Sequence, residues 1–179
     1  MKTDTYYSLV EIINKHNESE TGKILQCMLA LSFHHLLNCE AKYITINLVE
    51  GVDIVVDLDE FKYAIEVKTT SRDAIKIGEK DFGGLEKYKE KGYIPIICVL
   101  KIDLHSEWLL IDLDKLRRRR KSTWNNSDLY TDDRFKELSK NLNSTFEKLL
   151  LEYATQIIEN GLTYLLKILR ERGIKYSGK

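Results

Sequence analysis

The 179-residue chain is predicted to have an α/β fold, with a mixed central sheet flanked by helices and a helical extension at its C-terminus. Short β-rich runs alternate with helical patterns up to residue 121, which is typical of α/β domains. The segment from Ile24 to Leu37 is apolar almost all round, as expected for a helix covered on two sides. After a polar loop at 122–133, the sequence has helical periodicity to its end.

Each expected element follows from its local pattern. Residues 5–16 predict a short helix that ends in a polar segment, where Asn17 or Ser19 can cap a second helix at 22–37. In the core we then expect a strand at 42–51, a hairpin within 51–68, a helix at 78–92, and strands at 93–102 and 107–113. A short helix begun by Asp112 and Asp114 follows. The C-terminal part is expected to form helices at 135–148 and 149–172, with Gly161 as a possible break and Gly173 as the stop.

The hairpin carries the residues with the clearest chemistry. If Asp59 and Glu60 form a two-residue turn, Leu58 pairs with Phe61 and Asp53 lies directly opposite Glu66 on one face. In the same register Asp57 faces Lys62 instead. A slip of one residue would turn Asp53 to the other face, so the register decides whether the two acids meet.

Two facing carboxylates suit a hard cation. Mg²⁺, for which Mn²⁺ can substitute, is usually held by one or two acidic side chains together with substrate phosphate. The backbone carbonyl of Val67 could add a ligand between Glu66 and Lys68. Lys68 lies two residues after Glu66 on the same face, where its ammonium could orient or help deprotonate a water, or neutralise transition-state charge. The same residues also fit the solvated face of an amphipathic hairpin, since a bare Asp and Glu-x-Lys pattern is weak.

The order of elements from about Thr21 to Asp112 resembles the PD-(D/E)xK nuclease superfamily, in particular the archaeal Holliday junction resolvases and the Mrr-like restriction endonucleases. The resemblance implies a restriction-endonuclease-like core over residues 1–121 and a helical extension over 122–179 for recognition or dimerisation. It matches Asp53 to the first acid of the motif, Glu66 to the second and Lys68 to the lysine.

The sequence departs from the family pattern at two positions. Val52 stands where the family often has proline. The family's first helix usually offers a Glu to the metal, often four residues after a Gly, but the residue four after Gly22 is Gln26. Gln can bind a metal through its carbonyl but carries no charge. Glu20, one and a half turns earlier, is an alternative metal ligand.

Charge distribution suggests one nucleic-acid contact. The net charge is zero, so the distribution of charge matters more than its sum. An uninterrupted basic run could neutralise phosphates, although such a run also fits the cationic end of a short helix. The run comprises Arg117, Arg118, Arg119, Arg120 and Lys121.

Other residues predict the setting of the protein. Cys27, Cys39 and Cys98 lie in apolar segments without metal-ligand spacing, which predicts buried free thiols. Trp108 is expected in the core, whereas Trp124 is expected as an exposed aromatic in the polar loop. No apolar run is long enough to span a bilayer and the N-terminus has no signal-peptide pattern, so we expect a cytoplasmic, intracellular protein without a membrane partner.

The sequence therefore predicts a metal-dependent DNA endonuclease acting on duplex or branched DNA. Two alternatives stay open: an inactive nucleic-acid-binding or assembly subunit that keeps the fold, and an RNA nuclease. The C-terminal helices carry more apolar residues than a small subdomain usually buries, which predicts packing across the sheet or a homodimer interface.

Overall fold

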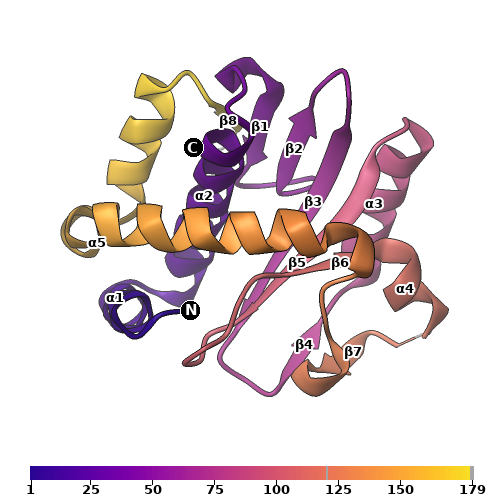
Figure 1. The fold of residues 1–179 in the computed structure, drawn as a ribbon, viewed down its shortest axis with the longest axis horizontal. Helices are drawn as coiled ribbons and strands as arrows, with labels where there is room; N and C mark the ends of the chain where they lie inside the picture. Colours follow the sequence, from indigo (N-terminus) through magenta and orange to yellow (C-terminus); the bar gives the residue numbers. More distant parts are fainter. Residues whose placement is uncertain (120, 178–179) are drawn as a thin grey trace.

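The computed structural model describes residues 1–119 and 121–177, and within them the main sheet has six strands in the order β6-β5-β3-β2-β1-β8 (Figure 1). The β3–β5 and β1–β8 pairs are parallel, and the other neighbouring pairs are antiparallel. The sheet is therefore mixed, as predicted. Its strands are β1 (Ile44–Asn47), β2 (Ile54–Asp57), β3 (Lys62–Thr70), β5 (Ile94–Lys101), β6 (Leu109–Asp112) and β8 (Lys175–Ser177).

Helices cover both faces of this sheet, which confirms the predicted fold class. One buried cluster joins α1, α2 and α5 to side chains of the central strands such as Ile54, Ile65 and Cys98. A second cluster joins α3 and α4 to Ala64 and Ile97 on the opposite face. The helices are α1 (Thr3–Lys15), α2 (Glu18–Leu37), α3 (Glu79–Glu90), α4 (Leu113–Arg118) and α5 (Lys136–Glu171).

The sandwiched helix predicted near the N-terminus is α2, whose residues from Ile24 to Phe33 are all buried. Asn17 caps it, because the Asn17 side chain accepts a hydrogen bond from the Glu20 backbone N–H. The long helix α5 crosses over α2 in Figure 1 and contributes to the same core. The apolar surface of α5 therefore packs largely against α1 and α2, within the core on one face of the sheet.

The C-terminal segment also shows why α5 bends and stops. Gly161 has φ 58° and ψ −144°, a conformation that other residues rarely adopt, and the helix changes direction there. Gly173 has φ 74° and follows the end of the helix. Both were predicted, but β8, which pairs with β1 after this stop, was not.

The predicted polar loop contains secondary structure. Its strand β7 (Thr123–Asn125) pairs with β4 (Ala74–Lys76) in a second sheet, with Trp124 opposite Ile75. The prediction of an exposed Trp124 is therefore wrong, because its ring is 1% exposed and packs near Phe82. Trp108 is fully buried as expected, whereas Cys39 is only partly buried. None of the described helices combines the length and the apolar character that a bilayer crossing requires.

Candidate active site

The predicted hairpin register is confirmed. Ile54 pairs with Ile65 and Asp57 with Lys62, and the Leu58 N–H donates to the Phe61 carbonyl at 3.1 Å to close the turn. Continuing this register by one residue beyond β2 sets Asp53 opposite Glu66. Asp57 and Lys62 form a half-exposed ion pair of 2.7 Å at the other end of the hairpin.

Asp53 is held at both its side chain and its backbone. Its Oδ2 accepts a hydrogen bond from the Val67 N–H at 2.7 Å. Its carbonyl accepts from Gln26 Nε2 and from the Asn47 N–H, both at 2.9 Å. Since these donors come from α2, β1 and β3, the position of Asp53 is set by three separate elements.

Lys68 lies between two carboxylates. Its Nζ is 2.7 Å from Glu66 Oε1 and 3.0 Å from Asp81 Oδ2. Asp81, in the first turn of α3, was not predicted as a site residue. Its Oδ2 also accepts a 2.9 Å hydrogen bond from the Gly78 N–H at the start of the helix. The sequence signal was an acid three residues after the glycine that precedes a helix, which normally indicates only a cap.

Burial raises the pKa values of both facing acids, Glu66 and Asp53. Burial raises the pKa of Glu66 to about 8, and the nearby Asp53 charge raises it further, against the opposing effect of Lys68. Burial also raises the pKa of Asp53 to about 6, although the Val67 N–H and Lys68 oppose it. Two neighbouring carboxyls that both resist ionisation in this way are typical of functional sites.

The pKa shifts of Asp81 and Lys68, in contrast, favour the charged form of each side chain. The pKa of Asp81 is lowered: burial alone would raise it, but the Gly78 N–H and Lys68 outweigh burial. The pKa of Lys68 is raised, because Glu66 and Asp81 outweigh the effect of its burial. Lys68 is therefore a stable ammonium at neutral pH, and Asp81 is a stable carboxylate.

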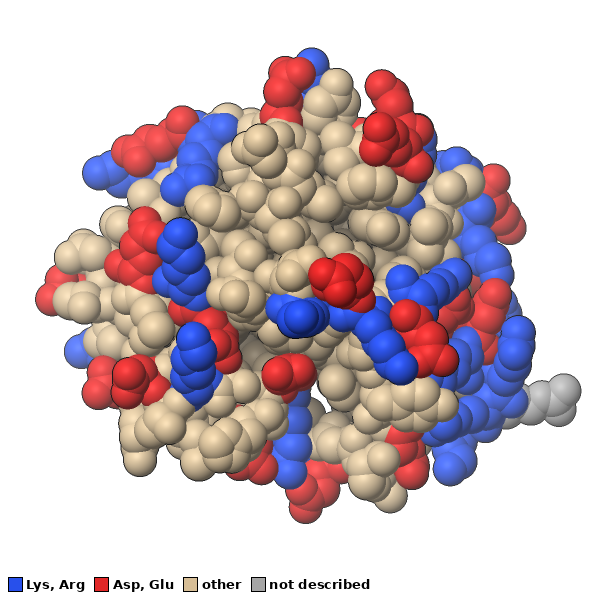
Figure 2. Space-filling view, viewed as in Figure 1, with Lys and Arg blue, Asp and Glu red and all other residues tan. Residues whose placement is uncertain are grey.

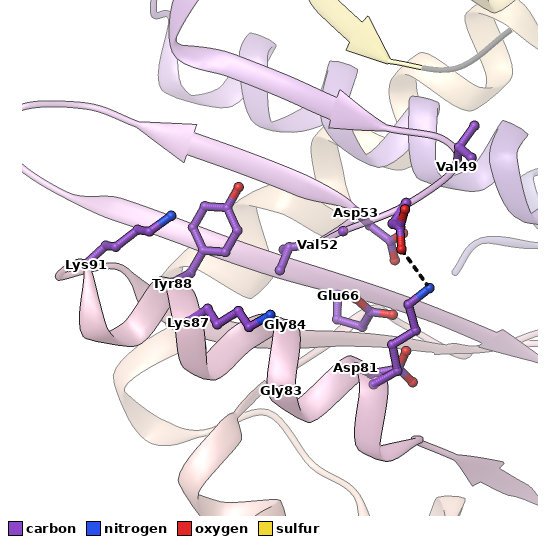
Figure 3. Close-up of a pocket in the computed structure, with 13 residues that line it drawn as sticks. Val49, Val52, Asp53, Glu66, Asp81, Gly83, Gly84, Lys87, Tyr88 and Lys91 are labelled. Carbon is purple, nitrogen blue, oxygen red and sulfur yellow. Dashed lines mark ion pairs between the residues drawn. The ribbon is translucent and has the colours of Figure 1, made fainter.

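The acids are reached from a cleft of about 550 Å³ between α3 and the segment Val49–Asp53. Figure 3 shows Asp53, Glu66 and Asp81 at one end of this cleft, and Lys87, Tyr88 and Lys91 along α3 toward the other end. Asp53 and Glu66 also line a second, smaller cavity of about 230 Å³ beside Gly22 and Gln26 of α2. Both acids therefore border two cavities, although Glu66 itself is largely buried.

Gln26 and Glu20, the two residues of α2 that were suggested as metal ligands, both make contacts with other parts of the protein. Gln26 lines the smaller cavity, but its Nε2 donates to the Asn47 and Asp53 carbonyls, so it positions the segment before β2. The Glu20 carboxylate lies at the break in α5, where it accepts the Leu162 N–H at 3.2 Å and contacts His16. These contacts hold the Glu20 side chain against α5, so they give no support to the suggestion that Glu20 is a metal ligand.

The Asp53 and Glu66 carboxylates suit a hard cation, although they are only two ligands. Within the described residues, no group of three or more acidic, imidazole or thiol side chains is arranged to hold a metal ion. The Lys68 ammonium pairs with both Glu66 and Asp81 and so offsets part of the negative charge beside the two acids. Asp53 and Glu66 remain as two carboxylates, the number that Mg²⁺ typically takes from protein.

The basic run after α4 is partly engaged within the protein. Arg117 forms an ion pair with Glu86 of α3, and Arg119 donates to the Asp128 carbonyl at 3.1 Å. Arg118 and Lys121 are exposed, and Arg120 lies outside the described residues. Lys and Arg side chains gather at the α3 and α4 end of the face seen in Figure 2. The run lies on the side of α3 that carries Glu86, next to the cleft but not among its lining residues.

Comparison with known proteins gives a partial likeness of fold. No family model and no curated protein matches the sequence. Among solved structures, the chain is similar to Hjc, a Holliday junction resolvase from the archaeal hyperthermophile Archaeoglobus fulgidus, with 19% sequence identity and a TM-score of 0.37. The aligned part covers 43% of this chain and 64% of the resolvase chain, which is less than two thirds of the resolvase.

Proposed function

We propose that the protein is a metal-dependent DNA endonuclease that hydrolyses phosphodiester bonds in duplex or branched DNA. One observation carries this proposal. The Asp53 and Glu66 carboxylates occupy facing positions of a hairpin, with the Lys68 ammonium 2.7 Å from Glu66, at the end of an open cleft. A buried arrangement of two acids and a lysine is not expected on a solvated hairpin face.

Asp53 and Glu66 would hold Mg²⁺ or Mn²⁺. Their raised pKa values support this assignment, because a nearby divalent cation would stabilise both ionised carboxylates. The Val67 carbonyl is the third proposed ligand. The N–H and carbonyl of one strand residue point to the same edge, and the Val67 N–H points to Asp53. When bound there, a divalent cation polarises a phosphate oxygen and makes a bound water more acidic.

Lys68 would act as a fixed positive charge rather than as a base. Its pKa is raised, so it keeps its proton at neutral pH and can donate to a phosphate oxygen as negative charge develops. Glu66 and Asp81 hold the ammonium at 2.7 and 3.0 Å. We assign Asp81 the role of positioning Lys68, which explains why an acid lies at the start of α3.

The proposal is tested by cleavage assays on supercoiled plasmid, a four-way junction, single-stranded DNA and RNA, each with Mg²⁺, Mn²⁺ or EDTA. We expect metal-dependent cutting of DNA that is lost in Glu66→Gln and Lys68→Met. Asp57→Asn and Lys62→Met are the matched controls, because they alter an acid and a lysine at the other end of the same hairpin. Equal cutting by the site variants and the controls would refute the assignment, and cutting confined to RNA would change the substrate.

A second candidate is a nucleic-acid-binding or assembly subunit without catalytic activity. The observation that favours it is Gln26, whose amide binds two backbone carbonyls where the family usually has a carboxylate for the metal. This candidate predicts DNA binding without cutting under every metal condition. The plasmid and junction assays therefore separate it from the nuclease.

The roles of the C-terminal residues and of oligomeric state are also proposals. Residues 122–179 would support recognition or dimerisation, and a homodimer would bring two sites to two strands of opposite polarity. A cytoplasmic setting is also part of this proposal. Sedimentation velocity with and without a four-way junction measures the oligomeric state directly, and two copies of the chain per junction is the expected stoichiometry.

A further inference from the structure

A stripe of lysines runs along the helix that forms one wall of the cleft. Lys80, Lys87 and Lys91 are spaced by seven and four residues, which places them on one side of α3 and its C-terminal end. All three side chains are exposed and all three line the cleft that reaches Asp53 and Glu66. From Lys80 to Lys91 the helix rises about 16 Å.

The lysines are available for a ligand. Lys80 makes a 3.4 Å ion pair with Glu50 across the cleft, but both side chains are more than three-quarters exposed, so the pair is weak. Lys91 lies over the Tyr88 ring, with its Nζ 5.2 Å from the ring centroid. Within the described residues Lys87 makes no ion pair. Binding an anion along this wall therefore breaks little existing structure.

The surface between the lysines is open. A Cβ added at Gly83 would meet no heavy atom within 4 Å, and one at Gly84 would only touch Val52 at 3.6 Å. A Cβ would therefore fit at Gly83, and the glycine leaves the helix backbone bare where it borders the cleft. Farther along, the partly buried Tyr88 presents its ring to the same cleft (Figure 3).

We propose that Lys80, Lys87 and Lys91 bind successive phosphates of the nucleic-acid strand that is cut. The strand would run along α3 from the acids toward Lys91, with Tyr88 against a sugar or base. A rise of about 16 Å corresponds to about five nucleotides of a stacked strand, with one phosphate per 3.4 Å. This inference rests on the proposed nuclease function and assigns the substrate to the α3 wall rather than to the Arg117–Lys121 run.

Binding assays test the inference without cleavage. Fluorescence anisotropy with labelled single-stranded DNA, a four-way junction and an RNA of the same sequence is measured in EDTA at several salt concentrations. The test protein is Lys87→Glu/Lys91→Glu. Lys15→Glu/Lys148→Glu is the control, because it makes the same charge change at exposed positions of α1 and α5. Arg118→Glu/Lys121→Glu tests the competing basic run.

The α3 variant is expected to weaken binding at least tenfold and to reduce the salt dependence of log K by about two ion contacts. The two other double variants should change affinity less than threefold, and circular dichroism should show that all remain folded. The inference is overturned if the α3 variant binds like the control, if the Arg118 and Lys121 variant accounts for the loss, or if the wild-type protein binds none of the probes.

Failure of the inference differs from failure of the proposed function. Metal-dependent cutting with unaltered binding by the α3 variant would keep the nuclease and refute the lysine track. The opposite outcome is also distinct. If the wild-type protein binds the probes but cuts none of the substrates, and the α3 variant loses binding, the lysine track is supported and the nuclease is refuted. Whether DNA or RNA shows the larger loss identifies the nucleic acid.

Discussion

The Val67 backbone N–H donates a 2.7 Å hydrogen bond to the Asp53 carboxylate, which joins the residue before β2 to the middle of β3. This bond fixes one Asp53 oxygen and leaves the other for the cation that we propose. Asp53→Asn keeps an oxygen that can accept the bond but removes the charge. We expect a loss of cutting of about 100-fold with a small change in Tm, because the catalytic role needs charge and the fold needs only the acceptor.

The control for this prediction is Asp57→Asn, because Asp57 is the acid at the opposite end of β2 and faces Lys62. Its cutting rate should stay within about twofold of wild type. If Asp53→Asn cuts as well as Asp57→Asn, the assignment of Asp53 to the catalytic site is refuted.

Asp81 should act through Lys68. Asp81→Asn keeps an acceptor for the Gly78 N–H but weakens the hold on the Lys68 ammonium, which is 3.0 Å away. We predict a fall in kcat of about tenfold with little change in Mn²⁺ affinity, measured by titration calorimetry. Glu79→Gln, an exposed acid of the same first turn, is the control. A large loss of Mn²⁺ affinity in Asp81→Asn would make Asp81 a metal ligand instead.

Replacing Gln26 by a carboxylate should destabilise the protein. Its amide donates to the carbonyls of Asn47 and Asp53, and a carboxylate cannot donate either bond. Gln26→Glu is therefore expected to lose about 2 kcal/mol of unfolding free energy, because two buried carbonyls lose a donor and a charge enters beside two acids. Urea unfolding in EDTA measures this loss. A gain in metal-dependent cutting by Gln26→Glu would show instead that the site lacks a third acidic ligand at this position.

Glu66 should make the metal-free protein less stable as the pH rises. Burial raises its pKa from an ordinary 4.5 to about 8, so the folded state binds more protons than the unfolded state between these values. Stability therefore falls as the pH increases through this window, and Asp53, with a pKa of about 6, acts in the same direction. In EDTA at pH 8, Glu66→Gln should raise Tm by about 3 °C or more, and the gain should vanish near pH 4.

Mg²⁺ should reverse this pH effect in the wild-type protein. A Tm that rises with Mg²⁺ at pH 8 in wild type, but not in Glu66→Gln, is the expected pattern. The same Tm for both proteins in EDTA across pH 4 to 9 would contradict the raised pKa.

The sequence was most informative where one local rule decides the geometry. The two-residue turn at Asp59 and Glu60 sets the index of every pair in the hairpin, so the facing of Asp53 and Glu66 could be predicted from spacing alone. Trp124 and Asp81 could not be placed in this way. Trp124 is buried because β7 pairs with β4, some fifty residues earlier, and Asp81 reaches Lys68 only because α3 packs on β3. Contacts between distant segments leave no local pattern.

Glu20 should matter for stability and not for chemistry. Its Oε1 accepts the Leu162 N–H just after Gly161, at the start of the second half of α5, where a carboxylate also interacts favourably with the helix dipole. We expect Glu20→Ala to cost about 1 kcal/mol of unfolding free energy. The kcat and the Mn²⁺ affinity of this variant should match those of Glu11→Ala, an exposed control on α1.

Gly161→Ala tests the same contact from the other side. The residue has φ 58° and ψ −144°, and an added Cβ would overlap Glu20 Oε1 and lie 2.8 Å from His16 Cε1. The strained backbone and this overlap should together cost about 3 kcal/mol. In the double variant Glu20→Ala/Gly161→Ala the overlap with Glu20 is removed, so the combined cost should be smaller than the sum of the two single costs. Additive costs, measured by urea unfolding, would mean that Glu20 does not contact the break in α5 and would reopen its assignment to the metal.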